Sequence, residues 1–123
     1  MTIIIDTHIF LWLLNDPVRI KPEHMDSIEN TANKIFLSSL SVAELVIKKS
    51  IGKLHFDFDI LEMAKDMEIE ILDFTGFDAV QLEALPLHHK DPFDRMIIAQ
   101  AHSNKYPIIS YDSKFSFYDC RLI

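Results

Sequence analysis

The chain has 123 residues, of which 49% are hydrophobic and only two are glycine, so its composition excludes a disordered protein and its length fits one domain over residues 1–123. The formal net charge of −7 argues against a broadly basic surface for nucleic acid. The single cysteine excludes an internal disulfide, no stretch is long enough to span a bilayer, and the amino terminus has no basic signal-peptide region, so we expect a cytoplasmic protein without membrane contact.

Short β-branched runs alternate with helical patterns along the chain. The first half predicts a strand at residues 2–5, helices at 8–15 and 21–34, a strand at 34–39 and a helix from Ser41 to about Gly52. The second half predicts a helix at 57–68, a strand at 68–74, a short helix from Thr75 to Leu85, a helix at 94–104, a strand at 106–110 and a candidate fifth strand at 120–123. This alternation predicts an α/β layer fold with a mainly parallel central sheet of four to five strands.

Acidic residues lie where the predicted strands end. Asp6 follows the first strand, and Asp112 follows the fourth. Glu44 lies in the predicted first turn of the helix after the second strand, and Asp94 lies in the first turn of the helix that leads into the fourth. Because sites in open parallel sheets form outside the carboxyl ends of the strands, we expect these four acids to meet at one edge, with Asp91 as a fifth candidate.

Four of these acids also have structural interpretations. In the segment SVAE, Glu44 matches the N3 position of a capping box that begins at Ser41. In the segment DPFD, Asp91 fits an N-cap followed by proline at N1, and Asp94 fits the first turn, where the helix dipole favours negative charge. Asp112 fits the start of an Asx-turn. The sequence leaves both interpretations open for each of these residues.

Asp6 is harder to explain by local structure. It lies between an apolar strand and an apolar helix, where we expect partial burial, and no Lys or Arg flanks it. A buried lone carboxylate costs several kcal/mol unless it is neutralised or paired, so we predict a bound cation. Oxygen ligands fit Mg²⁺ or Mn²⁺, whereas zinc favours Cys and His, and the pair His88–His89 lacks the usual helical zinc spacing. His8 is either a packing residue or a neighbour of this edge.

A carboxylate edge that holds Mg²⁺ or Mn²⁺ is suited to phosphodiester hydrolysis, because the ion lowers the pKa of a bound water and stabilises the leaving oxygen. In this scheme Asp6 is the central ligand, and Asp94 and Asp112 bind the metal directly or through water. Glu44 binds the ion or orients the attacking water. The negative net charge does not exclude such chemistry, since the cluster itself contributes several of the charges.

Four motifs occur in order over residues 2 to about 118, namely IIIDTHIFLWLL, SSLSVAELVIKKSIGKL, HHKDPFDRMIIAQA and IISYDSKF. Together they resemble the PIN-domain ribonucleases and, within them, the VapC-type toxins of type II toxin–antitoxin pairs. The resemblance implies a three-layer α/β/α fold and a Mg²⁺- or Mn²⁺-dependent endoribonuclease. The acid set of that family falls on Asp6, Glu44, Asp94 and Asp112.

The resemblance also implies supporting residues and partners. Asp91 becomes an N-cap or an outer support of the site, Ser110 lies near the metal, and Thr7 is a further supporting residue. Arg95 is either a contact to RNA phosphate or a surface pair. The implied partners are an RNA substrate, a second copy of the chain in a homodimer, and a small antitoxin whose segment occupies the acidic groove, often with a basic residue. Apolar residues in the helices near 41–50 and 57–67 fit either a dimer face or core packing.

Other function classes match the sequence less well than a metal-dependent ribonuclease does. A PIN-like binding module for nucleic acid or protein, without catalysis, is favoured by loss of an acid, and none of the four is missing. A haloacid-dehalogenase-type phosphatase needs Asp-x-Asp after the first strand, and Asp6-Thr7-His8 departs from that pattern. A receiver-type phosphoacceptor needs an acidic pair near the first strand end, which is absent here.

Overall fold

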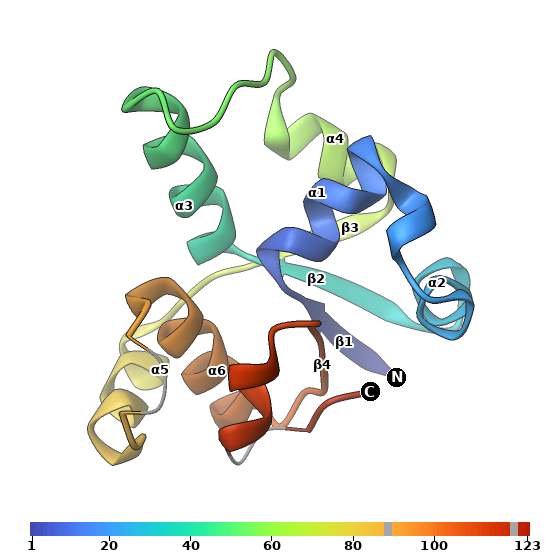
Figure 1. Cartoon of the computed structure of the whole chain (residues 1–123). Coiled ribbons are helices and arrows are strands. Elements are labelled where there is room, and N and C mark those ends of the chain that lie inside the picture. Colours follow the sequence, from blue (N-terminus) through green and yellow to red (C-terminus); the bar gives the residue numbers. More distant parts are fainter. Residues whose placement is uncertain (88–89, 119–120) are drawn as a thin grey trace.

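The computed structural model describes residues 1–87, 90–118 and 121–123, so His88, His89 and Cys120 lie outside the described residues. Within them the sheet has four strands in the order β3-β2-β1-β4, and every pairing is parallel (Figure 1). The strands are β1 (Thr2–Ile5), β2 (Lys34–Ser38), β3 (Ile69–Leu72) and β4 (Ile108–Ile109). The predicted α/β fold with a parallel sheet is confirmed. The candidate fifth strand is reduced to a single parallel bridge between Ile108 and Leu122.

Helices connect the strands, as the alternating pattern predicts. The α-helices are α1 (Thr7–Asn15), α2 (Pro22–Glu29), α3 (Ser39–Ser50), α4 (Ile60–Asp66), α5 (Gly76–Val80) and α6 (Pro92–Asn104). Three short 3₁₀ segments follow α1, α5 and β4, namely η1 (Pro17–Arg19), η2 (Gln81–Ala84) and η3 (Ser113–Phe117). The helix expected from Thr75 to Leu85 is therefore divided into α5 and η2. No helix in the described parts of the chain is both long and apolar enough to cross a membrane.

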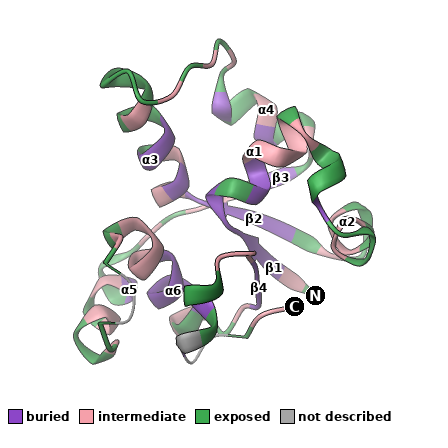
Figure 2. Cartoon of the chain, in the orientation of Figure 1, coloured by how far each residue is buried: buried purple, intermediate pink, exposed green. Residues whose placement is uncertain are grey.

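The sheet is buried on both faces, which explains why β1 is apolar at successive positions instead of alternating. Ile3 and Ile5 belong to one core together with Phe10 of α1, and α1, α2 and α4 cover this face (Figure 1). Ile4 points the other way into a second core with Ile98 of α6. Figure 2 shows β1, β2 and β4 as mostly buried, whereas much of the helical surface is exposed. Burial of each such side chain stabilises the fold by roughly 1.5–3 kcal/mol.

The strand register aligns three carboxyl ends at one edge of the sheet. Ile5 is paired with Leu37 of β2 on one side and with Ile109 of β4 on the other. The backbone N–H of Asp6 donates to the carbonyl of Ile109 at 3.1 Å. This hydrogen bond places Asp6, the residue after β1, level with the end of β4. The first turns of α1 and α3 therefore start side by side at this edge.

A buried aspartate joins α5 to α6. Thr75 and Asp78 form a capping box, in which the Asp78 N–H donates to Thr75 Oγ1 at 3.1 Å and the Thr75 N–H donates to Asp78 Oδ2 at 3.0 Å. Asp78 is 3% exposed, and its other oxygen accepts from the Ser103 hydroxyl of α6. The predicted cap at Thr75 is confirmed, and the same carboxylate also fixes α5 against its neighbour.

Replacement of Asp78 by alanine is expected to lower the free energy of unfolding by about 1–3 kcal/mol, because the cap is lost and a buried hydroxyl loses its acceptor. Urea denaturation measures this change. The matched control is Asp73→Ala at an exposed position, where we expect a change within about 0.5 kcal/mol. Equal destabilisation by the two variants would contradict the assigned role of Asp78.

Candidate active site

Asp6 is held in a fixed orientation at the carboxyl end of β1. It is 3% exposed, and it is also the N-cap of α1, since its Oδ1 accepts from the Ile9 N–H at 2.9 Å. Its Oδ2 accepts from the Ser110 hydroxyl at 2.6 Å. The cap was not predicted from the sequence, although Asp before a helical apolar run is the usual signal for one. The carboxylate is thus part of the local structure and at the same time faces the strand end of β4.

Burial raises the pKa of Asp6 above its ordinary value, and the nearby Asp112 carboxylate raises it further. The hydrogen bonds from Ser110 and from the Ile9 backbone, together with His8, oppose this rise without cancelling it. The ionised form of Asp6 is therefore destabilised in the protein alone, and a cation beside it offsets that cost.

This shift predicts a pH dependence of stability in metal-free buffer. Because the folded pKa of Asp6 is raised, its favourable contribution is present below the unfolded pKa and is lost as pH rises through the folded pKa. The Tm of Asp6→Asn minus that of the wild type is therefore expected to increase as pH is raised from the ordinary aspartate pKa through the raised one. Thermal melts in EDTA across this range measure it, and a pH-independent difference would contradict the assignment.

Ser110 links the two acids at the ends of β1 and β4. Its hydroxyl donates to Asp6 and accepts from the backbone N–H of Asp112 at 3.2 Å. The Asp112 side chain accepts from the Lys114 N–H at 2.9 Å and caps η3, so the predicted Asx-turn is present. Asp6 and Asp112 line the same cavity, which places both carboxylates at one position on the edge. The expected place of Ser110 near a metal stays a prediction.

Glu44 has a different setting from the one predicted. The helix α3 begins at Ser39 with Ser38 as its N-cap, so the expected capping box of Ser41 and Glu44 does not form. Glu44 is the sixth residue of α3, in its second turn instead of its first. The chain enters the helix early because Ser38, at the end of β2, already accepts from the Leu40 N–H at 3.1 Å. This shift frees Glu44 for contacts across the edge.

Thr7 connects Glu44 to the end of β1. Thr7 Oγ1 lies 2.9 Å from Glu44 Oε1 and 2.8 Å from Ser41 Oγ, and these three side chains are buried. Because a hydroxyl carries one hydrogen and a carboxylate only accepts, Thr7 donates to Glu44 and Ser41 donates to Thr7. Thr7 directly follows Asp6 in the chain. Its hydrogen bond to Glu44 therefore links Glu44 to the residue next to Asp6.

Lys48 is a cation in the acidic edge that the sequence reasoning missed. Its Nζ lies 2.7 Å from Glu44 Oε2, and the hydrogen bond to Glu44 is the main cause that raises the pKa of Lys48. The charges of Asp91 and Asp94 raise it further, while burial lowers it. The Lys48 ammonium therefore lies within the field of three carboxylates from α3 and α6. The i, i+4 spacing in ELVIK was the available signal.

The start of α6 agrees with the structural interpretation of its two aspartates. Asp91 is the N-cap, and its Oδ1 accepts from the N–H groups of Phe93 at 2.9 Å and Asp94 at 3.3 Å. Asp94 lies in the first turn, after proline at N1. Arg95 is half-buried, and its Nη2 donates to the Leu85 carbonyl at 3.2 Å. Arg95 thus anchors the segment before α6, and its contact with RNA phosphate stays a prediction.

The four predicted acids have different surroundings. Asp6 and Asp112 line one cavity, and Glu44 is tied to the end of β1 through Thr7. Asp94 is near enough to Lys48 for its charge to raise the pKa of that lysine. Among residues 1–87, 90–118 and 121–123, no three His, Cys, Asp or Glu side chains are close enough together to enclose a metal ion. The donor chemistry nevertheless fits a hard divalent cation, because all four donors are carboxylates and burial of Asp6 disfavours its ionised form unless a cation lies beside it.

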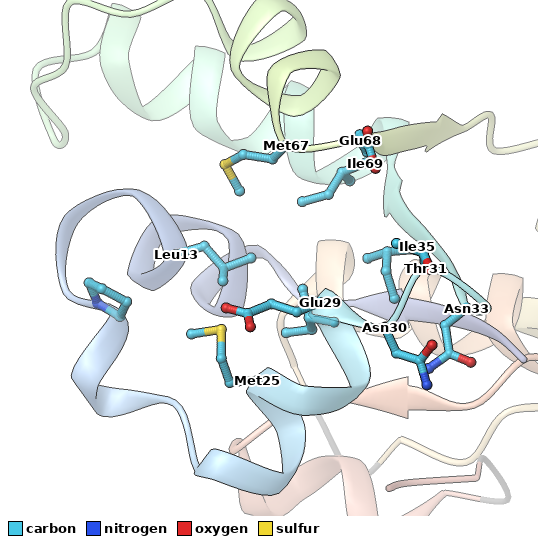
Figure 3. A pocket seen from close by; sticks show the side chains of 12 residues that line it. Leu13, Met25, Glu29, Asn30, Thr31, Asn33, Ile35, Met67, Glu68 and Ile69 are labelled. Atoms are coloured by element: carbon cyan, nitrogen blue, oxygen red, sulfur yellow. The ribbon is translucent and has the colours of Figure 1, made fainter.

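A larger cavity, about 410 Å³, lies at the opposite edge of the sheet (Figure 3). Asn33 precedes β2 there and Ile69 begins β3, so this is the amino edge. Its side chains include Leu13, Met25 and Met67, which point toward one another (Figure 3). None of the four predicted acids lines it, and it is separate from the candidate site.

Comparison with known proteins places this fold. The family model of the PIN domain matches residues 3–119. A search of curated protein sequences finds no match. Among solved structures, VapBC2 from Rickettsia felis, bound to a DNA fragment from its promoter, is 18% identical with a TM-score of 0.77, covering 100% of this chain and 98% of that chain.

Two further solved structures are similar over nearly their whole length. DNA-bound VapBC from Salmonella typhimurium is 17% identical with a TM-score of 0.71, covering 100% of this chain and 97% of that chain. FitAcB from Neisseria gonorrhoeae is 20% identical with a TM-score of 0.60, covering 98% of this chain and 96% of that chain. These likenesses establish a shared fold. Because the family model covers nearly the whole sequence, the chain belongs to the PIN domain family.

Proposed function

We propose that this chain is a Mg²⁺- or Mn²⁺-dependent endoribonuclease, that residues 1–123 form a single PIN domain, and that it acts in the cytoplasm as the toxin of a VapBC-type toxin–antitoxin pair. The observation that carries the proposal is the Asp6 carboxylate, 3% exposed, beside Asp112 at the carboxyl edge of a parallel sheet. Membership of the PIN family and the likeness to VapBC and FitAcB structures support it.

In the proposed reaction, Asp6, Asp94 and Asp112 would hold the ion, and Glu44 would bind it or orient the attacking water. A bound Mg²⁺ or Mn²⁺ supplies activation of water at neutral pH and stabilisation of charge on the scissile phosphate. The protein orients the carboxylates. The Ser110 hydroxyl donates a hydrogen bond to the Asp6 carboxylate and accepts one from the backbone N–H of Asp112.

The other supporting residues act on Glu44 and on the start of α6. Thr7 holds one oxygen of Glu44, and Lys48 holds the other. Asp91 caps α6 and so positions Asp94 in the first turn. Each of these contacts limits the rotation of a carboxylate, which preserves the geometry needed for metal-assisted hydrolysis.

The proposed partners are an antitoxin, RNA and a second copy of the chain. Two of the VapBC structures similar to this chain were solved with bound DNA, and the antitoxin proposal rests on the likeness to VapBC structures. The net charge of −7 is compatible with a basic antitoxin segment. Exposed apolar side chains on and near α3, namely Val46, Ile47 and Ile51, offer a surface for protein contact, whereas Leu45 of the same helix is in the core.

Cleavage of RNA by the purified chain, freed of any co-purified protein, tests the function. Total cellular RNA and unstructured oligonucleotides are incubated with Mg²⁺, with Mn²⁺ or with EDTA, and products are resolved on denaturing gels. We expect discrete cuts with either ion and none in EDTA. The Asp6→Asn protein, prepared in parallel, controls for contaminating nucleases. Binding of RNA without cleavage under every condition would favour the alternative, a PIN-like binding module without catalysis.

A further inference from the structure

A small cavity lies between a group of aromatic rings and the two acids Asp6 and Asp112 at the carboxyl edge of the sheet. Its volume is about 200 Å³, and Asp6, His8, Trp12, Tyr111 and Asp112 line it. It is smaller than the roughly 300–1,000 Å³ pockets that hold drug-sized ligands. The cavity has room for a single planar ring system that turns one face toward the aromatic side chains. Two of its five lining residues are proposed metal ligands, so any ligand in it lies directly beside the reacting centre.

The rings around this cavity form a continuous platform. The centroids of Trp12 and Tyr111 lie 5.5 Å apart with an interplanar angle of 35°, and those of His8 and Trp12 lie 6.5 Å apart. His24 continues the series, 5.3 Å from the Tyr111 ring. His8 is exposed, and Trp12 and Tyr111 are half-buried, so the platform is accessible from solvent. The rings are tilted relative to one another. Accessible aromatic side chains stack nucleobases in proteins that bind single strands.

Tyr111 is fixed in place before any ligand arrives. Its hydroxyl accepts from the Lys21 backbone N–H at 2.9 Å and is 2.6 Å from His24 Nδ1. His24 is half-buried, and it makes this contact from α2. A ring held at its hydroxyl loses little entropy on stacking, which favours binding.

Two cations lie over the same rings. The Arg19 guanidinium carbon is 4.5 Å from the Trp12 ring centroid, and Lys21 Nζ is 5.3 Å from the Tyr111 ring centroid. Both residues are exposed, so their charges are available to an anion that approaches these two rings. In a chain of net charge −7, this local positive charge disfavours a basic peptide at the rings and favours a phosphate backbone.

We propose that this ring cavity, formed by His8, Trp12 and Tyr111, binds one unstacked base of single-stranded RNA next to the scissile phosphate, while Arg19 and Lys21 contact the flanking phosphates. The inference rests on the proposed ribonuclease function and adds a requirement for an unpaired nucleotide at the cut. A base inside a duplex is already stacked on its neighbours and cannot enter such a cavity without first being unpaired.

Trp12 is the single tryptophan of the chain, so its fluorescence reports occupancy of the cavity. The probes are a single-stranded oligoribonucleotide, its duplex, an abasic strand of the same length and an arginine-rich peptide. Titrations are made in Ca²⁺, which binds the same oxygen ligands with looser geometry, and gels verify that the RNA stays intact. We expect saturable quenching by the single strand and at least about tenfold weaker responses to the duplex and the abasic strand.

Substitutions at Tyr111 separate its ring from its hydroxyl. Tyr111→Leu is expected to weaken binding of the single strand by roughly 5- to 150-fold, which corresponds to the usual loss of one base–aromatic contact. Tyr111→Phe keeps the ring but loses the hydroxyl that holds it, so it is expected to weaken binding less than Tyr111→Leu does. His8→Ala, at an exposed position, provides a second ring deletion that does not disturb the core.

The outcomes distinguish failure of this inference from failure of the ribonuclease assignment. If the wild type cleaves RNA in Mg²⁺ but neither ring deletion weakens binding or raises KM, the base-binding cavity is wrong and the nuclease stands. Equal quenching by the abasic strand, or quenching by the arginine-rich peptide and not by RNA, overturns the inference as well. Absence of both cleavage and RNA binding by the wild type rejects the proposed function itself.

Discussion

Asp6→Asn is expected to reduce metal-dependent RNA cleavage by at least about a hundredfold, because replacement of a ligand exceeds the 10- to 100-fold effect of outer-shell changes. Asparagine has one neutral amide oxygen in place of two charged oxygens, so it binds Mg²⁺ or Mn²⁺ weakly. Initial rates on a fluorescent oligoribonucleotide in Mg²⁺ measure the change.

The same substitution is expected to leave the fold intact. Asparagine is as good an N-cap as aspartate, so the Ile9 N–H keeps an acceptor. The Ser110 hydroxyl can accept from the new amide group where it previously donated. Loss of a buried charge beside Asp112 also removes a repulsion. Circular dichroism verifies the fold, and cleavage at the wild-type rate would reject Asp6 as a metal ligand.

Phe10→Ala is expected to lower the free energy of unfolding by about 3–5 kcal/mol, the usual effect of deleting a buried aromatic side chain. Phe10 is 0% exposed and packs α1 against the first face of the sheet. Because α1 also carries Asp6 and Thr7, loosening this helix disturbs the site as well as the core. For a chain of this length the corresponding fall in Tm is roughly 10–20 °C.

Phe77→Ala is the matched control, since it removes the same side chain from a position that is 68% exposed. We expect a change within about 0.5 kcal/mol for this variant. Urea denaturation of both variants measures the difference. A Phe10→Ala protein as stable as Phe77→Ala would show that the core is assigned to the wrong face of α1.

The position of Asp6 at the sheet edge could be predicted because the signal for the first strand is strong. The run TIII at residues 2–5 is apolar at successive positions and stops at Asp6, and the parallel register then carries the same level across to Ser110. The caps at Asp91 and Thr75 could also be predicted, since each precedes a proline or an acid at the expected helical position.

The setting of Glu44 could not be predicted, because two serines compete to start α3. The segment SVAE satisfies a capping box in sequence, but Ser38 caps the helix first and moves Glu44 into the second turn. The contact with Thr7 depends on β1 and β2 being neighbours in the sheet, which no local pattern records. Local propensity fixes an element's existence better than its first residue.

The ring platform was missed for a related reason. Trp12, His24 and Tyr111 come from α1, α2 and the end of β4, and each alone resembles a packing or surface residue. Only the return of β4 to the side of β1 brings Tyr111 against α1. Contacts between residues so far apart in the sequence depend on the topology of the fold, and the periodicity of the local sequence does not indicate them.

The proposed carboxylate metal site can be examined by Mn²⁺ binding, detected as loss of the EPR signal of the free ion. This experiment measures the metal site without requiring the correct RNA. We expect saturable binding by the wild type and at least about tenfold weaker binding by Asp94→Asn. The matched variant Asp91→Asn keeps the cap of α6 and is expected to bind within about twofold of the wild type. No binding by the wild type, or equal loss in both variants, would contradict a metal site built on these carboxylates.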